Sequence, residues 1–388
     1  MKLLSIIFIA ILINFSASAQ LNLQWDVAIG GEGSETANGA IETPDGGFII
    51  VGSTTSEGSG KLDGYIVKVS ASGDEDWSQT YGGKKDDEFY SIIKYNDNYA
   101  ITGYSASKGK GKKDYWFMMI DNEGNKLWEH FYGGDKDDEA YDLIKTFDNN
   151  IAIAGYTKSK GPKKHNFYVI KINPQATGKD QGKIIWNRTA GSSGTDIAVR
   201  LKQSPQDSFI YVLGHTTSYG AGGMDIYFIK SDKERGSAKK KIFFGGKNFE
   251  HGNDFCFLPD GSFMIVGGTM SNSKGYFDGY ALQIEKEYFK VWDKSYGDLK
   301  NEEFVSVFID GEGFVFGGFT ESQGEGKSDA WIMKVDNKGE VITERTFGEE
   351  KNDKINRMIK CKDGTYLMVG ETESKGDGDK SMWVLKIN

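Results

Sequence analysis

One pattern recurs seven times along this chain and constrains its fold more than any other feature. Gly-x-Thr/Ser-x-Ser begins, at steps of 51 to 59 residues, at Gly52, Gly103, Gly155, Gly214, Gly267, Gly318 and Gly370. Periods of this length are typical of propellers and related arrays. A single small sheet cannot bury both of its faces, so the repeats are predicted to pack against one another in a ring.

Each repeat contains four predicted strands and shows no sustained 3.6-residue apolar period. In the first repeat, turn signals separate strands predicted at 37–42, 47–54, 63–70 and 76–81. The longest step is attributed to an insertion around residues 174–183, between a third and a fourth strand. The predicted fold is all-β: residues 20–388 form one seven-bladed β-propeller of four-stranded antiparallel blades.

The two ends of the chain predict how this ring closes. Residues 23–29 have the signature of an outermost strand, but no other strands precede them, and residues 381–387 form a third strand without a fourth. Unpaired strand edges leave backbone donors and acceptors bare. We therefore expect residues 23–29 to complete the last blade, antiparallel to residues 381–387.

The first 19 residues predict export. They combine Lys2, an apolar stretch and a small-residue tail ending at Ala19, which is typical of a cleaved secretory signal peptide; an uncleaved anchor is the alternative. The expected location is the periplasm, the cell surface or the medium. No later apolar run is long enough for a membrane span. The formal net charge is -9 and arginine is scarce, which argues against nucleic acid as a partner.

A carboxylate stands five residues after the glycine that ends each outer-strand segment. The seven are Glu35, Asp87, Asp138, Asp196, Glu250, Glu302 and Asp353. We expect them beside the central channel, where converging carboxylates could bind a cation or a cationic peptide. The favoured interpretation is structural, because a residue present once in every repeat fits a local role as acceptor for turn N–H groups or Thr/Ser hydroxyls.

The loops of the second and third repeats predict a basic patch. It comprises Lys108, Lys110, Lys112, Lys113, Lys158, Lys160, Lys163 and Lys164. Solvated loops explain such lysines, and an anionic surface or an acidic glycan is the alternative.

No catalytic residue, metal-ligand set or cofactor is predicted. The four histidines fall in different repeats without ligand spacing, and Glu250-His251 is interpreted as a surface turn. Cys256 and Cys361 lie at different offsets in non-consecutive repeats, so both are predicted to be free thiols within strands. In five repeats a tryptophan stands five residues before the glycine that ends the outer-strand segment. These tryptophans are expected to pack between neighbouring sheets.

Two strings carry a family resemblance. Residues 121–128, Asp-Asn-Glu-Gly-Asn-Lys-Leu-Trp, followed by Tyr132-Gly133-Gly134, and residues 329–336 resemble the secreted bacterial β-propeller repeat family, with kelch- or quinoprotein-like four-stranded blades. The D-x-x-G-x-x-x-W portion is similar to the tryptophan-docking motif of quinoprotein and outer-membrane-assembly propellers. Those typically have eight blades, whereas seven are countable here, and no vicinal cysteine pair accompanies them. The lysine-rich usage resembles a Bacteroidota-type secretome.

This resemblance implies the fold and no single activity. The predicted function is a non-enzymatic, exported module, monomeric outside a complex, that binds a protein or a glycan on its loop face or acts as a scaffold in the cell envelope. A subunit of an outer-membrane complex is a further possibility. The alternative is a glycan-cleaving enzyme with acids from separate blades, which would require two carboxyls about 5 to 10 Å apart in a cleft.

Overall fold

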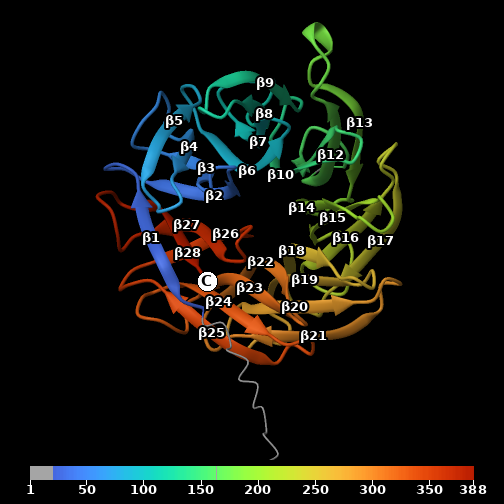
Figure 1. The fold of residues 1–388 in the computed structure, drawn as a ribbon. Coiled ribbons are helices and arrows are strands. Elements are labelled where there is room, and N and C mark those ends of the chain that lie inside the picture. Colours follow the sequence, from blue (N-terminus) through green and yellow to red (C-terminus); the bar gives the residue numbers. More distant parts are fainter. Residues whose placement is uncertain (1–20, 163) are drawn as a thin grey trace, which may run out of the picture.

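Seven four-stranded sheets surround a central opening (Figure 1). This computed structural model describes residues 21–388 except residue 163, so the predicted signal peptide and Lys163 lie outside the described residues. Each sheet takes three or four consecutive strands and pairs them antiparallel, as in the first blade, where β2, β3, β4 and β5 follow one another. The predicted all-β, seven-bladed propeller is confirmed.

The strands are numbered in chain order. The innermost strands are β2 (Glu35–Glu42), β6 (Asp87–Tyr95), β10 (Asp138–Lys145), β14 (Asp196–Gln203), β18 (Glu250–Phe257), β22 (Glu302–Asp310) and β26 (Asp353–Lys360). The second strands are β3 (Phe48–Thr54), β7 (Asn98–Ser105), β11 (Ile151–Thr157), β15 (Ile210–Thr216), β19 (Phe263–Thr269), β23 (Gly313–Thr320) and β27 (Tyr366–Thr372). The third strands are β4 (Asp63–Val69), β8 (Asp114–Ile120), β12 (Asn166–Asn173), β16 (Asp225–Ser231), β20 (Asp278–Ile284), β24 (Asp329–Val335) and β28 (Ser381–Ile387). The outer strands are β5 (Glu75–Tyr81), β9 (Lys126–Tyr132), β13 (Lys183–Ala190), β17 (Ala238–Phe244), β21 (Lys290–Tyr296), β25 (Val341–Phe347) and β1 (Leu23–Ile29).

The core lies between neighbouring blades. The second and third strands of the first blade, β3 and β4, are buried along their whole length, whereas its outer strand β5 is exposed or half-buried. Both faces of a middle strand must therefore be apolar, which explains runs such as Phe48–Val51. One cluster joins Val51 and Ile66 of the first blade to Phe89 and Trp116 of the second. Burying such side chains is the main term that stabilises each junction.

The ring closes as the ends of the chain predict. The N-terminal strand β1 pairs antiparallel with β28, with Val27 opposite Val384 and Ile29 opposite Met382. In Figure 1 the blue strand β1 lies along the red strands of the last blade. Arg345 fixes the start of this strand, since its Nη1 donates to the Leu21 carbonyl and to Asn22 Oδ1. The predicted closure is confirmed.

The structure also tests the predictions for the insertion and for the two cysteines. One helical turn is present among residues 21–162 and 164–388: η1 (Gly178–Asp180), in the predicted insertion between β12 and β13. Cys256 lies in β18 as predicted, but the prediction of a strand was wrong for Cys361, which follows the last residue of β26 and begins a turn. Both are free thiols. Within the described residues, no helix is long and apolar enough to cross a membrane.

Tryptophans join five of the seven outer strands, β1, β5, β9, β13 and β21, to the next blade. Trp25 donates its Nε1–H to the Ala71 carbonyl, in the turn before the outer strand of the first blade. In the second blade the turn glycine, Gly124, has φ +84° and packs so closely on Trp77 that a Cβ there would lie 2.6 Å from the ring. Only glycine fits both demands. The glycine of one docking-like motif thus packs on the tryptophan of the preceding repeat, across a blade junction. This is the packing between sheets that the sequence predicts.

Candidate functional site

The seven repeated carboxylates hold the turns of their own blades. Their residues are 0 to 1% exposed. Asp196 is representative: it accepts from the Ser192 N–H (3.0 Å), the Ser218 hydroxyl (2.7 Å) and the Thr216 hydroxyl. The N–H four residues earlier donates to the carboxylate in every blade. The hydrogen bonds that the structural interpretation expects are present in every blade, and binding of a ligand by the same ring stays a prediction.

The same seven residues also join each blade to the one before it. Their backbone N–H groups donate to carbonyls just before the third strand of the preceding blade, at 2.7 to 3.0 Å, ending with Glu35 N–H to Lys380 O across the closure. The segments that link consecutive blades and the loops between second and third strands therefore lie on one face of the ring.

A second set of polar residues was missed by sequence reasoning. Each third strand begins with a buried Asp, Asn or Ser: Asp63, Asp114, Asn166, Asp225, Asp278, Asp329 and Ser381. Asp114 accepts from the N–H groups of Lys110 and Gly111, which explains the repeated glycine loops. Burial raises the pKa of Asp114, and the charge of Asp138 in the next blade adds to the rise. The available signal was an Asp two residues before the repeated aromatic.

Acids neutralise part of the predicted basic patch. Lys108 pairs with Glu129, Lys113 with Glu139 and Lys158 with Asp137, each at 2.8 Å. Lys160 donates to the Tyr168 hydroxyl. The remaining described members, Lys110, Lys112 and Lys164, are exposed. An anionic partner for this patch stays a prediction that depends on those three lysines.

The channel contains a pocket that sequence reasoning did not identify. Every innermost strand carries a β-bulge at its fourth residue, where the register shifts, for example between Ala140 and Asp142. The bulged residues are Asn38, Tyr90, Tyr141, Val199, Asn253, Val305 and Asn356, and all seven line one cavity of about 230 Å³. A bulge turns an unpaired residue away from the ladder, so here it aims one side chain per blade into the channel.

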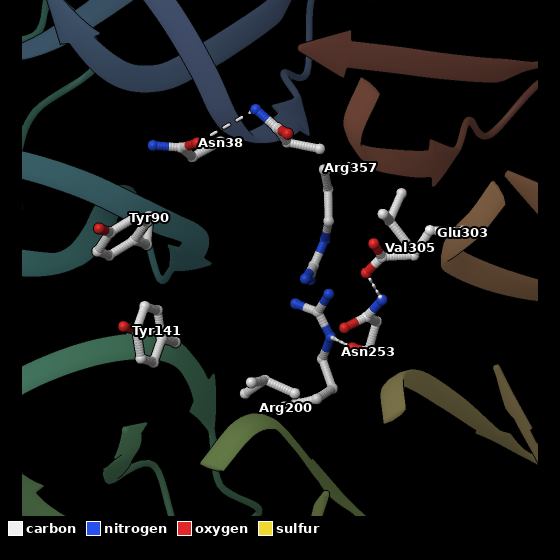
Figure 2. Close-up of a pocket in the computed structure, with 10 residues that line it drawn as sticks. Asn38, Tyr90, Tyr141, Arg200, Asn253, Glu303, Val305 and Arg357 are labelled. Atoms are coloured by element: carbon white, nitrogen blue, oxygen red, sulfur yellow. Dashed lines mark hydrogen bonds between the residues drawn. The ribbon is translucent and has the colours of Figure 1, made fainter. Parts of the chain in front are cut away.

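Two arginines enter this pocket from different blades. Arg200 on β14 and Arg357 on β26 follow bulged residues, and Figure 2 shows their guanidinium groups meeting in the middle of the pocket. Both lie near the same oxygen, Asp142 Oδ1, at 3.6 Å from Arg200 Nη1 and 3.8 Å from Arg357 Nη2. The chain has few arginines, and two of them converge here.

A tyrosine wall lies across the pocket from the arginines (Figure 2). The rings of Tyr90 and Tyr141 are 5.0 Å apart between centroids and inclined at 47°. Their hydroxyls donate to Glu88 and Glu139 on their own strands, which fixes the orientation of the rings. Burial raises the pKa of Tyr90 and of Tyr141, and nearby glutamates add to both rises, so the hydroxyls stay protonated.

The remaining polar side chains of the pocket are paired. Asn253 donates from Nδ2 to Glu303 Oε1 (2.6 Å) and to the Phe304 carbonyl (2.9 Å), which leaves Oδ1 as an acceptor. His251 Nε2 lies 2.8 Å from the same glutamate oxygen. Burial opposes the charge of His251, but Glu303 outweighs it and raises the pKa of the imidazole. The prediction that His251 occupies a surface turn was wrong: it is a half-buried residue of β18, because that strand begins at Glu250.

The carboxylates of this pocket bear on the predicted alternative, a glycan-cleaving enzyme. Among the described residues, Glu303 is the single carboxylate that lines the pocket. Despite burial, which acts in the opposite direction, His251 holds the pKa of Glu303 below its ordinary value. Glycoside hydrolysis needs two carboxyls beside the scissile bond, one of them able to give up a proton. This arrangement does not provide that pair.

Sequence reasoning missed the pocket because simple strand alternation, without the bulges, predicts the wrong directions for these side chains. Strict alternation along a strand would send Tyr141 and Asp142 to opposite faces. The bulge breaks this alternation, so pairs such as Asn253-Asp254 and Asn356-Arg357 both approach the channel.

Comparison with known proteins establishes the fold alone. No protein-family model matches the chain, and no curated protein matches it. Among solved structures, the WD40 β-propeller domain of Doa1 is similar at TM-score 0.56 and 10% identity, covering 95% of this chain and 97% of that one. A europium-containing methanol dehydrogenase gives 0.52 and 11%, with 95% and 93% covered. BBS1N, solved in complex with ARL6DN, gives 0.52 and 11%, with 95% and 97% covered. At these identities, the shared feature is the propeller architecture.

Proposed function

We propose that this chain is an exported, non-enzymatic propeller of the cell envelope or cell exterior that binds a glycan in its channel pocket. The observation that carries the proposal is the lining itself. Seven bulges turn one side chain per blade into the channel, and the two tyrosines among them form an aromatic wall that faces two arginines. Three asparagines among them contribute amides to the lining. Sugar rings bind where an aromatic face packs on their C–H groups and polar groups accept or donate to their hydroxyls.

The size of the pocket limits the ligand. Its volume of about 230 Å³ is below the range of about 300–1,000 Å³ usual for sites of drug-sized molecules. A single sugar ring, or the end of a glycan chain, is therefore the expected occupant. The predicted signal peptide supports a location where glycans are encountered.

A glycan array tests the proposal. The mature chain is applied to printed neutral and acidic oligosaccharides, beside Tyr141→Leu, which removes the flat ring from the pocket and keeps an apolar side chain. Tyr276→Leu is the matched control, because that tyrosine is 67% exposed and lies outside the pocket. The proposal expects binding that Tyr141→Leu weakens and Tyr276→Leu leaves unchanged. Binding to no glycan, or equal loss in both variants, would reject it.

A protein partner is the second candidate, and a specific observation favours it. Phe249, Tyr276 and Leu299 are large, apolar and exposed, at 43%, 67% and 70%, in loops of the carboxylate-bearing face. Exposed apolar groups of this kind are typical of interaction sites. Capture of an envelope protein by the wild type, abolished in the double variant Tyr276→Ser/Leu299→Ser, would support a scaffold role. Capture that persists in this variant would place the interface elsewhere.

A further inference from the structure

The contacts within the channel leave positive charge uncompensated. Arg200, Arg357 and Lys202 approach two carboxylates, Asp142 and Asp254. Lys202 Nζ lies 2.9 Å from Asp254 Oδ1, and Arg200 Nε lies 3.3 Å from the same atom. Three cations therefore share two anions, and the carboxylate that lines the pocket, Glu303, is paired with His251 instead. A charge with little access to water is costly unless it is paired, so this cluster favours one more negative charge.

The two guanidinium groups also have unused donors directed into the cavity. The side chain of Arg200 is 8% exposed, and its Nε–H donates to the Asn253 carbonyl at 3.2 Å. Within the described residues, its terminal nitrogens make no hydrogen bond, and the Arg357 side chain makes none. Each guanidinium carries five N–H donors. Buried donors such as those of Arg200 are almost always satisfied, whereas the Arg357 side chain is 24% exposed. The unmet donors and the excess charge lie at one place.

We propose that Arg200 and Arg357 bind the carboxylate of an acidic sugar, with its ring against Tyr90 and Tyr141. This inference rests on the proposed function and names its ligand class, a uronate. The planar fork of a guanidinium matches the two oxygens of a carboxylate, and such charge-assisted bonds are among the strongest in proteins. The free Asn253 Oδ1 provides an acceptor for a ring hydroxyl at the same site.

Isothermal titration with three probes tests the assignment: glucuronate, glucuronamide and glucose. The amide keeps the shape of the acid and removes its charge, and glucose replaces the carboxylate with a hydroxymethyl group. We expect glucuronate to bind at least about tenfold more tightly than either neutral sugar, as charge-assisted hydrogen bonds imply. Arg357→Met should abolish this preference. Arg357 is chosen over Arg200 because it is less buried, so its replacement disturbs the fold less.

Two further variants keep the test decisive. Arg357→Lys keeps the charge without the fork and should retain part of the preference, so an unfolded Arg357→Met does not end the experiment. Arg235→Met is the matched control, since Arg235 is exposed in the turn before β17 and should change nothing. Equal affinity for glucuronate and glucuronamide, or an undiminished preference in Arg357→Met, would overturn the uronate assignment and leave glycan binding intact. Binding of none of the three sugars, together with a blank glycan array, would overturn both.

Discussion

Two sets of residues on the same seven strands behave differently. The first residue of each innermost strand is always a carboxylate, and it accepts nearly the same hydrogen bonds in every blade. The fourth residue is Asn, Tyr, Tyr, Val, Asn, Val or Asn, and it lines the channel pocket. Repetition marks the position that every blade needs in order to fold. Variation at an equally central position marks the place where the ring departs from its symmetry, and there we locate ligand binding.

The largest expected effect concerns the repeated ring, because the experiment tests whether the ring needs the strand that closes it. Deleting residues 21–30 removes β1 and leaves the edge of β28 unpaired. Bare strand edges and lost packing at the closure should abolish cooperative folding of the whole ring. Thermal unfolding followed by far-ultraviolet circular dichroism checks this. A truncated chain that unfolds as sharply as the full chain, at nearly the same temperature, would show that closure by β1 is not needed.

An intermediate effect is expected at the tryptophan junctions, which are also repeated. Gly364, in the turn between β26 and β27, provides the control without a tryptophan. Gly364→Ala places a side chain at φ +88° with no atom within 4 Å, so backbone strain should lower the unfolding free energy by about 1–2 kcal/mol. Gly124→Ala adds the close approach to Trp77 and should cost roughly 1–3 kcal/mol more. Urea unfolding of both variants measures the difference. Equal costs would mean that the tryptophan contact contributes nothing beyond the turn.

The smallest effect is a pH dependence. Burial raises the pKa of Asp114 and of Asp329, and the carboxylate of the following blade adds to each. Such groups bind protons more tightly in the folded state, so stability should rise as pH falls from neutral through their folded pKa values. Asp45 acts in the opposite sense, but only in stronger acid, since the hydrogen bond from Thr43 lowers its pKa to about 2.

Asp114→Asn sharpens this test, because Asn166 already occupies the equivalent position in the third blade. The variant should fold and show a shallower rise of melting temperature as pH falls from neutral into the acid range. A slope identical to that of the wild type would mean that Asp114 does not titrate in this range.

The repeated half of the molecule was predictable, and the channel was not. Seven glycine patterns and seven carboxylates at regular spacing, with tryptophans in five repeats, signal a ring, because they reflect local demands of each repeat. The spare strand at residues 23–29 signals how the ring closes. The pocket depends on bulges, and a bulge is a small change of register that leaves no fixed residue type behind. Arg200 and Arg357 are 157 positions apart in the sequence. Their convergence across the channel follows only from the ring geometry.

The most direct test of the account compares two variants three residues apart on β10. Asp138→Asn weakens a carboxylate that accepts from Gly134 N–H and the Ser159 hydroxyl. It should lower the unfolding free energy by about 1 to 3 kcal/mol and leave the affinity for glucuronate unchanged in the folded protein. Tyr141→Leu should leave stability closer to the wild type and weaken that affinity. The opposite pattern, with binding lost in Asp138→Asn and retained in Tyr141→Leu, would contradict the division between a repeated ring that folds and a varied channel that binds.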